Sequence, residues 1–148
     1  MILIQKIELP VPGIEQMRAE ARSQSYNFLE TLVEEWQSGE NRFDAPGEIL
    51  CGHLHQGQLI AVGGLNIDPF LPIEDPPQIG RIRRVYVMSA WRNQGIGRAL
   101  VQALIHESKK GFRQVRLRAE NDPAARLYES LGFVPIASPS ATHILRFE

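Results

Sequence analysis

The chain of 148 residues has one cysteine, no long apolar run and almost no net charge. The single Cys51 excludes an internal disulfide and a zinc site built from several cysteines, and it fits a reducing compartment. Sixteen basic and seventeen acidic residues give a formal charge of −1, so the basic excess of a dedicated nucleic-acid binder is missing. No stretch approaches the roughly 18 apolar residues of a membrane-spanning helix, and the apolar N-terminal run is too short for a signal peptide. These absences favour a cytoplasmic protein without nucleic-acid or membrane partners.

The composition is that of an ordinary globular domain. Hydrophobic residues make up 43% and charged residues 22%, which excludes a disordered chain. A chain of this length buries roughly two-thirds of its unfolded surface, so it needs no metal or disulfide for stability. The proline-rich residues 68–78 are expected to form a loop, because strand-like sequence resumes directly after them. We therefore expect one domain over residues 1–148.

The apolar pattern predicts strands and helices alternating around one sheet, which is an α+β or mixed α/β domain. Asp122 followed by Pro123 is typical of a helix start, with Asp122 as the cap, and Gly132 of a helix end. Residues 14–40 fit one long helix or two short ones. The expected strands cover 2–9, 48–56, 58–67, 79–88, 112–119, 133–137 and 142–147, and the other expected helices cover 95–110 and 124–131.

The most informative segment is residues 85–100, where a predicted strand passes through a short turn into a helix. Gly95 and Gly97 stand at the entry to that helix. A helix N-terminus offers about four unpaired N–H groups and a partial positive charge, and glycines let the backbone approach a ligand closely. This combination suits a phosphate or pyrophosphate, and Arg92 and Arg98 would add positive charge.

Neither common phosphate loop fits this segment. A Walker A loop needs Lys-Ser/Thr after its last glycine, where this chain has Arg98-Ala99. A dinucleotide fingerprint needs a third glycine at the position of Leu100. Taken alone, the two glycines are explained equally well by a tight strand-to-helix turn without a ligand.

Longer motifs around the two glycines and farther along the chain are more specific than the glycines alone. The run Arg92–Leu100, Arg-Asn-Gln-Gly-Ile-Gly-Arg-Ala-Leu, resembles the Arg/Gln-x-x-Gly-x-Gly/Ala motif of the GNAT N-acetyltransferase superfamily. Arg84–Val87 resembles the fourth strand of that family, and Asn121–Phe133 resembles its second motif, in which Asn, Ala, Leu-Tyr-Glu and Gly-Phe recur at these spacings. The resemblance is specific over residues 79–136 and compatible in element order over residues 1–78. It implies a mostly antiparallel sheet of six or seven strands, splayed between strands four and five and flanked by about four helices.

The resemblance also implies acetyl-CoA as co-substrate, bound where the two strands splay. Main-chain groups of Val85, Tyr86 and Val87 would then bind the pantetheine arm and the thioester. Asn121 would bind the pantetheine arm or orient the start of its helix, and a plain turn residue before Asp122 is the alternative. Loop N–H groups would bind the pyrophosphate, and the matching residues are Asn93, Gln94, Gly95, Ile96, Gly97 and Arg98.

In such enzymes an amine attacks the thioester carbonyl directly. The N–H of Val87 would stabilise the oxyanion. Tyr128 matches the tyrosine that gives a proton to the leaving thiolate, and a phenol of pKa ~10 can do so for a thiolate of pKa ~8.5. A helix tyrosine packed on the sheet with its hydroxyl capped is the alternative for Tyr128. Cys51 lies in a predicted strand far from the motif, so we expect transfer in a ternary complex rather than through an acetyl-cysteine.

No general base follows from the resemblance. Many relatives carry a Glu on the fourth strand, where this chain has Gly-Arg-Ile-Arg-Arg at 80–84, and some carry a Glu at the position of Arg116. His53 and His55 lack a third ligand for a metal, so no metal site is expected. The open alternatives are a water chain or one of Asp68, Glu74, Asp75, Glu120, His53 and His55.

The sequence thus predicts an acetyl-CoA-dependent N-acetyltransferase whose acceptor amine is open. Acidic residues between 30 and 48 would attract a cationic amine or simply form a solvated helix face. Phe28, Trp36 and Phe70 fit either the core or the wall of an acceptor pocket. The rival functions are an acyl-CoA-binding sensor or regulatory subunit without turnover, and a partner protein without a ligand. A homodimer is compatible with the resemblance.

Overall fold

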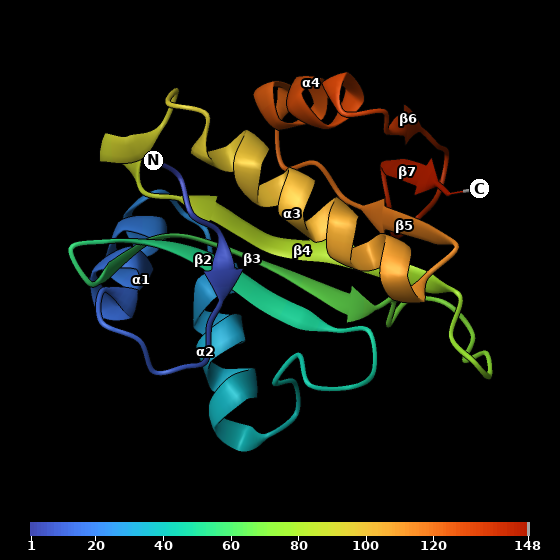
Figure 1. Cartoon of the computed structure of the whole chain (residues 1–148), viewed down its shortest axis with the longest axis horizontal. Helices are drawn as coiled ribbons and strands as arrows, with labels where there is room; N and C mark the ends of the chain where they lie inside the picture. Colours follow the sequence, from blue (N-terminus) through green and yellow to red (C-terminus); the bar gives the residue numbers. More distant parts are fainter. Residues whose placement is uncertain (148) are drawn as a thin grey trace.

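The structure is a computed structural model, and it describes residues 1–147. The chain folds around one seven-stranded sheet (Figure 1). The spatial order of the strands is the first three in chain order, then the fourth, fifth, seventh and sixth. All neighbours are antiparallel except the fourth and fifth strands, which run parallel. The elements are β1 (Gln5–Lys6), α1 (Ile14–Ser23), α2 (Phe28–Ser38), β2 (Ile49–His55), β3 (Gln58–Ile67), β4 (Ile79–Val87), a 3₁₀ helix (Ser89–Trp91), α3 (Ile96–Gly111), β5 (Gln114–Leu117), α4 (Asp122–Ser130), β6 (Val134–Pro135) and β7 (His143–Arg146).

The predicted class and the order of elements are confirmed, whereas several boundaries differ. The first strand is only two residues long, because β1 pairs with β2 at Gln5 and Lys6 alone. Residues 14–40 form two helices, separated at a turn where Ser25 has a φ of 66°. The predicted cap at Asp122 is wrong, because the side chain of Asn121 accepts the hydrogen bond from the N–H of Ala124 at 2.9 Å. Asn and Asp are about equally good helix caps, so the sequence alone does not distinguish Asn121 from Asp122 as the capping residue.

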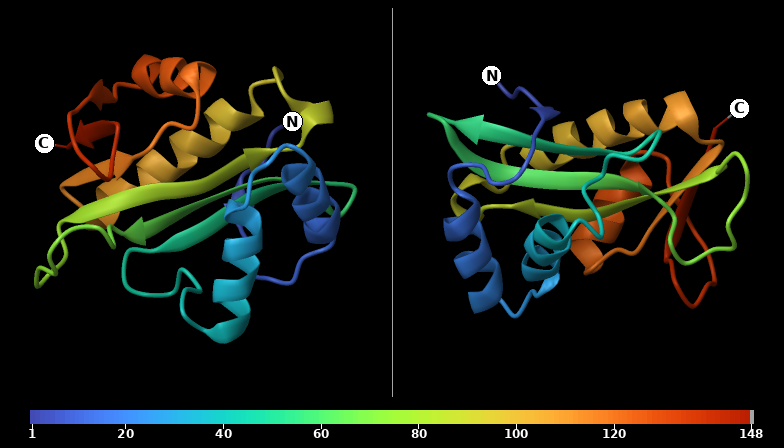
Figure 2. Two further views of the ribbon diagram at one scale, coloured as in Figure 1. Left: turned by 180° about the vertical axis from the view of Figure 1, so that it is seen from behind. Right: turned by 90° about the horizontal axis from the view of Figure 1, so that it is seen from below.

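Helices cover both sides of the long strands β2–β4. Helices α1 and α2 lie on one side and α3 lies on the other, as the right-hand view of Figure 2 shows. Leu29 and Leu32 of α2 are fully buried in one apolar cluster, and Leu100 and Leu104 of α3 are fully buried in the other. Helix α4 packs beside the start of α3. Within residues 1–147, the helices are all too short or too polar to cross a membrane.

The sheet splits beyond the first residues of β4 and β5. These strands pair only from Ile79 to Arg81 on β4. Farther along, β4 contains a bulge: it advances by three residues from Arg83 to Tyr86, while the partner strand β3 advances by two, between Gly64 and Val62. Arg84, inside the bulge, has a φ of 60°, in the left-handed region. A bulge bends and twists its strand, so the rest of β4 diverges from β5. The predicted splay between the fourth and fifth strands is confirmed.

Candidate functional site

The gap between β4 and β5 opens into a cleft of about 420 Å³. Its wall combines Tyr26 and Phe28 around the start of α2, then β4 and the turn into α3, and finally the loop after β5 with the first turns of α4. The cleft therefore gathers segments from three separate stretches of the chain. The predicted site residues that line it are Val85, Tyr86, Val87, Arg92, Asn93, Gly97, Asn121 and Tyr128.

The other four predicted residues lie at the start of α3 but not on the cleft wall. Ile96 is 3% exposed and belongs to the core beneath the helix. The Arg98 guanidinium donates to Ser130 Oγ on α4 at 2.8 Å. The Gln94 amide donates to the carbonyl of Ala90 at 3.4 Å. Gly95 caps the helix with a φ of 83°. Any contact of these residues with a ligand through backbone N–H groups stays a prediction.

The start of α3 has the properties of an anion site. The helix's first hydrogen bond runs from the N–H of Ala99 to the carbonyl of Gly95 at 3.0 Å. The N–H groups of Ile96, Gly97 and Arg98 precede it, so they have no partner in the preceding turn. The helix dipole adds partial positive charge there. The cleft wall at this point thus fits the pyrophosphate of a CoA-type ligand.

The open edge of β4 offers main-chain groups to the same ligand. The N–H of Met88 donates to the carbonyl of Ile60 on β3 at 2.9 Å. Because neighbouring residues of an antiparallel strand turn their backbone groups to opposite edges, those of Val87 point away from β3, toward the gap. In agreement, the Val87 carbonyl accepts from Arg92 Nε at 2.9 Å. The N–H of Val87 is therefore placed where an oxygen in the cleft could accept from it.

Arg92 is held against β4 rather than standing free beside the loop. Besides Val87, its guanidinium donates to Gln24 Oε1 at 3.1 Å and lies 5.2 Å from the centre of the Tyr86 ring. The Tyr86 hydroxyl is itself engaged, since it donates to Glu20 Oε1 at 2.5 Å. Burial and this hydrogen bond raise the pKa of Tyr86. Tyr86 thus has a structural hydroxyl and is no proton donor to the cleft.

Tyr128 differs from Tyr86 in having a free hydroxyl. Its side chain is 7% exposed and its ring lies 5.8 Å from that of Phe133. Within residues 1–147 the hydroxyl has no hydrogen-bond partner, although Tyr128 lines the cleft. Burial, and then the charge of Glu120, raise the pKa of Tyr128 to about 12. The phenol is therefore protonated at neutral pH and available to a ligand, unlike the capped hydroxyl of the alternative interpretation.

A second space of about 210 Å³ adjoins the cleft. It is lined by Phe28 of α2, Phe70 of the β3–β4 loop, part of β4 and the loop after β5. Glu120 and Tyr128 line both spaces, so the two meet at these side chains. We call the second space the acceptor pocket, after the amine acceptor that the predicted reaction would place there. Phe28 and Phe70 thus lie on its wall, whereas Trp36 packs against the core on the α2 side.

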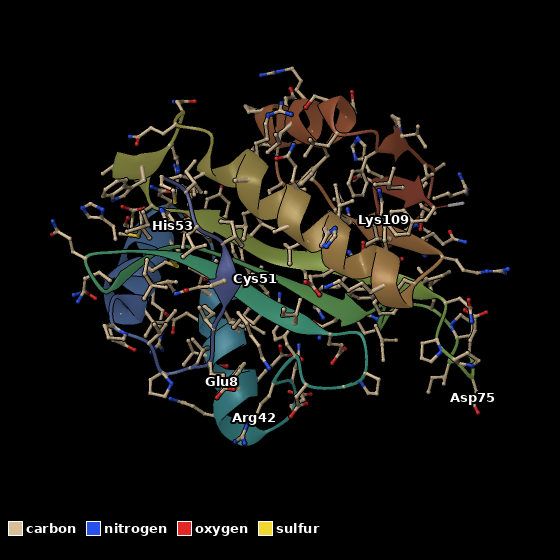
Figure 3. All side chains as sticks on the ribbon, viewed as in Figure 1. Glu8, Arg42, Cys51, His53, Asp75 and Lys109 are labelled. Carbon is tan, nitrogen blue, oxygen red and sulfur yellow. The ribbon has the colours of Figure 1, made fainter. Side chains whose placement is uncertain are left out.

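Among the candidate bases, Glu120 alone lines both spaces in the described structure. Asp68 is buried and engaged, with Oδ2 at 3.4 Å from Arg116 Nε and Oδ1 at 3.8 Å from Arg81 Nη1. Glu74 lines a different pocket, within the β3–β4 loop. Figure 3 shows Asp75 at the tip of this loop.

The candidate residues His53, His55 and Cys51 pack against other parts of the fold and do not line the cleft or the acceptor pocket. His53 Nδ1 lies 2.9 Å from the carbonyl of Leu3, and the ring of His55 packs 4.5 Å from that of Trp91. No group of three metal-ligating side chains occurs in residues 1–147. Cys51 lies on β2 (Figure 3), where burial raises the pKa of its thiol to about 11. A buried protonated thiol is a poor acetyl carrier, in keeping with direct transfer.

The acidic residues between 30 and 48 do not gather at the acceptor pocket. Glu30 accepts from Arg18 at 2.8 Å and Arg22 at 2.6 Å, and these arginines lower its pKa to about 2. Glu48 accepts from the N–H of Ile67 at 2.8 Å. In the described structure none of the acidic residues from this stretch lines the cleft or the pocket. An attraction of a cationic amine by this stretch therefore loses its structural basis.

Comparison with known proteins gives a consistent picture. The sequence model of the acetyltransferase (GNAT) family matches residues 13–133. A putative acetyltransferase from Exiguobacterium sp. 255-15 has a TM-score of 0.85 at 24% identity, over 99% of this chain and 93% of that one. The ribosomal-protein-alanine N-acetyltransferase of Brucella melitensis gives 0.68 at 21% identity, over 97% and 96%. A putative acetyltransferase from Salmonella typhimurium, solved with acetyl-CoA, gives 0.66 at 15% identity, over 99% and 94%. At these identities the likeness to solved structures concerns the fold.

Proposed function

The chain belongs to the acetyltransferase (GNAT) family, and we propose that it moves the acetyl group of acetyl-CoA to an amine by direct attack in a ternary complex. Residues 1–148 would act as one catalytic domain. The observation that carries the proposal is the free, protonated hydroxyl of Tyr128 at the junction of the cleft and the acceptor pocket. A ligand-binding sensor would have no use for a proton donor at that point.

The protein's own groups account for each proton and charge. Acetyl-CoA supplies a thioester, whose carbonyl carbon forms a bond with the nitrogen of the amine. The N–H of Val87 donates to the carbonyl oxygen as that oxygen gains negative charge. Tyr128 gives its proton to the sulfur when the carbon–sulfur bond breaks. Glu120 takes the proton that the amine loses and passes it to solvent, and solvent restores the proton of Tyr128. The products are the amide and CoA.

The proposal is tested by titrating the protein with acetyl-CoA in a calorimeter and by following thiol release with a panel of amines. We expect saturable binding of acetyl-CoA, and thiol release that requires both the protein and an amine. Binding without thiol release from any amine would favour the sensor. A folded protein that binds neither acetyl-CoA nor CoA would rule out both.

The role of Glu120 is tested by Glu120→Gln. We expect kcat/KM at neutral pH to fall about 10²-fold, the usual size of a general-base effect, while the affinity for acetyl-CoA stays unchanged. The deficit should narrow as pH rises, because more of the amine is then already deprotonated. Glu74→Gln is the matched control, since Glu74 lies outside both spaces. Unchanged turnover in Glu120→Gln would assign the proton to a water chain instead.

A further inference from the structure

The charged side chains that line the acceptor pocket are mostly positive. Arg81, Arg83 and Arg84 reach it from β4 and Arg118 reaches it from the loop after β5, whereas Glu120 is its one acidic lining residue in the described structure. Three arginines from one short strand can meet in one pocket because of the bulge at Arg84, which breaks the regular alternation of side chains.

Most of these arginines already have partners. Arg81 donates to the carbonyl of Ser140 at 2.6 Å and lies beside Asp68. Arg84 forms an ion pair with Glu35 at 3.2 Å, and Arg118 donates to the carbonyl of Pro139 at 2.7 Å. These bonds fix the three side chains as parts of the pocket wall.

Arg83 has no such partner. Within residues 1–147 its guanidinium makes no hydrogen bond and no ion pair, and it lies 5.9 Å from the centre of the Phe70 ring. Burial first, and then the neighbouring charge of Arg84, lower the pKa of Arg83 to about 10. Arg84 and Arg81 add further unused donors, because Arg84 Nε and Arg81 Nη1 are buried without a hydrogen-bond partner. A half-buried guanidinium without a partner, next to a buried Nε without a partner, is stabilised by an anion.

We infer that the acceptor is a small amine that also carries an oxyanion group, a carboxylate or its phosphonate or sulfonate counterpart, and that Arg83 binds this group. The inference rests on the proposed function and names the substrate class for the same site. The guanidinium fork matches two oxygens of such a group. The pocket volume of about 210 Å³ suits a small molecule. A substrate with a second positive charge would be repelled by the arginines.

The test compares amino acids with their amides as acceptors, in a series of rising length: glycine, β-alanine and 4-aminobutyrate. Aminomethylphosphonate and taurine extend the series to the other oxyanions. For the best-fitting length we expect kcat/KM to favour the acid over its amide by about 10- to 100-fold, the effect of a paired charge-assisted hydrogen bond. Comparing kcat/KM among the phosphonate, the sulfonate and the carboxylates then identifies which oxyanion fits the pocket.

Arg83→Gln should reduce the acid-to-amide preference by the same factor and leave acetyl-CoA binding unchanged. Comparing the ratio between variant and wild type cancels the different basicities of acid and amide. Arg113→Gln is the control, because Arg113 is exposed immediately before β5 and lies on neither wall. Amides used as well as acids, or an unchanged ratio in Arg83→Gln, would overturn the inference while the acetyltransferase stands.

A binding measurement keeps the inference testable without turnover. The protein saturated with CoA is titrated with N-acetyl-β-alanine and with its amide. We expect the acid to bind more tightly, and Arg83→Gln to abolish the difference. Equal binding of the two products, or no binding of either, contradicts the inference. Failure of acetyl-CoA itself to bind would be a failure of the proposed function, and the two results are thus distinguishable.

Discussion

Replacing Tyr128 by phenylalanine should slow turnover by about 10²-fold or more while leaving the affinity for acetyl-CoA nearly unchanged. The expected separation follows from the site. The hydroxyl has no protein partner within residues 1–147, so its loss breaks no hydrogen bond of the fold. The ring still packs against Phe133, and the cleft keeps its shape. What disappears is the proton for the departing sulfur, which matters only while the carbon–sulfur bond breaks.

The measurement is thiol release at saturating amine, with acetyl-CoA affinity and thermal unfolding measured in parallel. The pH profile gives an independent check. Burial and Glu120 raise the pKa of Tyr128 to about 12, so the proton is lost only as pH rises through that value. Turnover of the wild type should therefore not fall near pH ~10, where an ordinary tyrosine ionises. An unaffected rate in Tyr128→Phe would remove the hydroxyl from the mechanism.

The sequence predicted the parts of the site that depend on short spacings. The glycines at the start of α3 and Tyr128 on α4 are each defined by neighbours within about one turn of a helix. Their local motifs were therefore recognisable without knowledge of distant contacts, and the structure brings Gly97 and Tyr128 to one cleft, whereas their roles in binding and proton transfer stay predictions. The splay was predicted through the family resemblance and not from spacing.

The acceptor side could not be predicted, because it depends on contacts between distant segments. The run of arginines in β4 was visible in the sequence, but a regular strand would place Arg83 and Arg84 on opposite faces. The bulge at Arg84 changes which side chains meet. Likewise, only the fold shows that Asp68 forms ion pairs with Arg81 and Arg116. Glu120 is then the candidate carboxylate that lines both the cleft and the acceptor pocket.

Replacing Gly97 by aspartate should reduce acetyl-CoA binding by more than about 10²-fold, because a carboxylate then occupies an anion site at close range. The helix itself should tolerate the change. A Cβ at position 97 would lie 3.7 Å from a methyl group of Val87 and 3.9 Å from one of Leu127, which are ordinary contacts. An acidic residue in the first turn of α3 also complements the helix dipole. The loss should therefore come from the ligand site and not from unfolding.

Two matched variants separate the causes. Gly97→Ala adds only a methyl group, and Gly97→Asn has nearly the volume of aspartate without its charge. We expect affinity to fall in the order alanine, asparagine, aspartate, with the last step shrinking at high salt because screening weakens charge repulsion. Calorimetric titration with acetyl-CoA measures each step, and thermal unfolding confirms that the variants are folded. If Gly97→Asp binds acetyl-CoA as tightly as the wild type, the pyrophosphate does not lie at the start of α3. The glycine there would then serve only the turn from β4 into the helix.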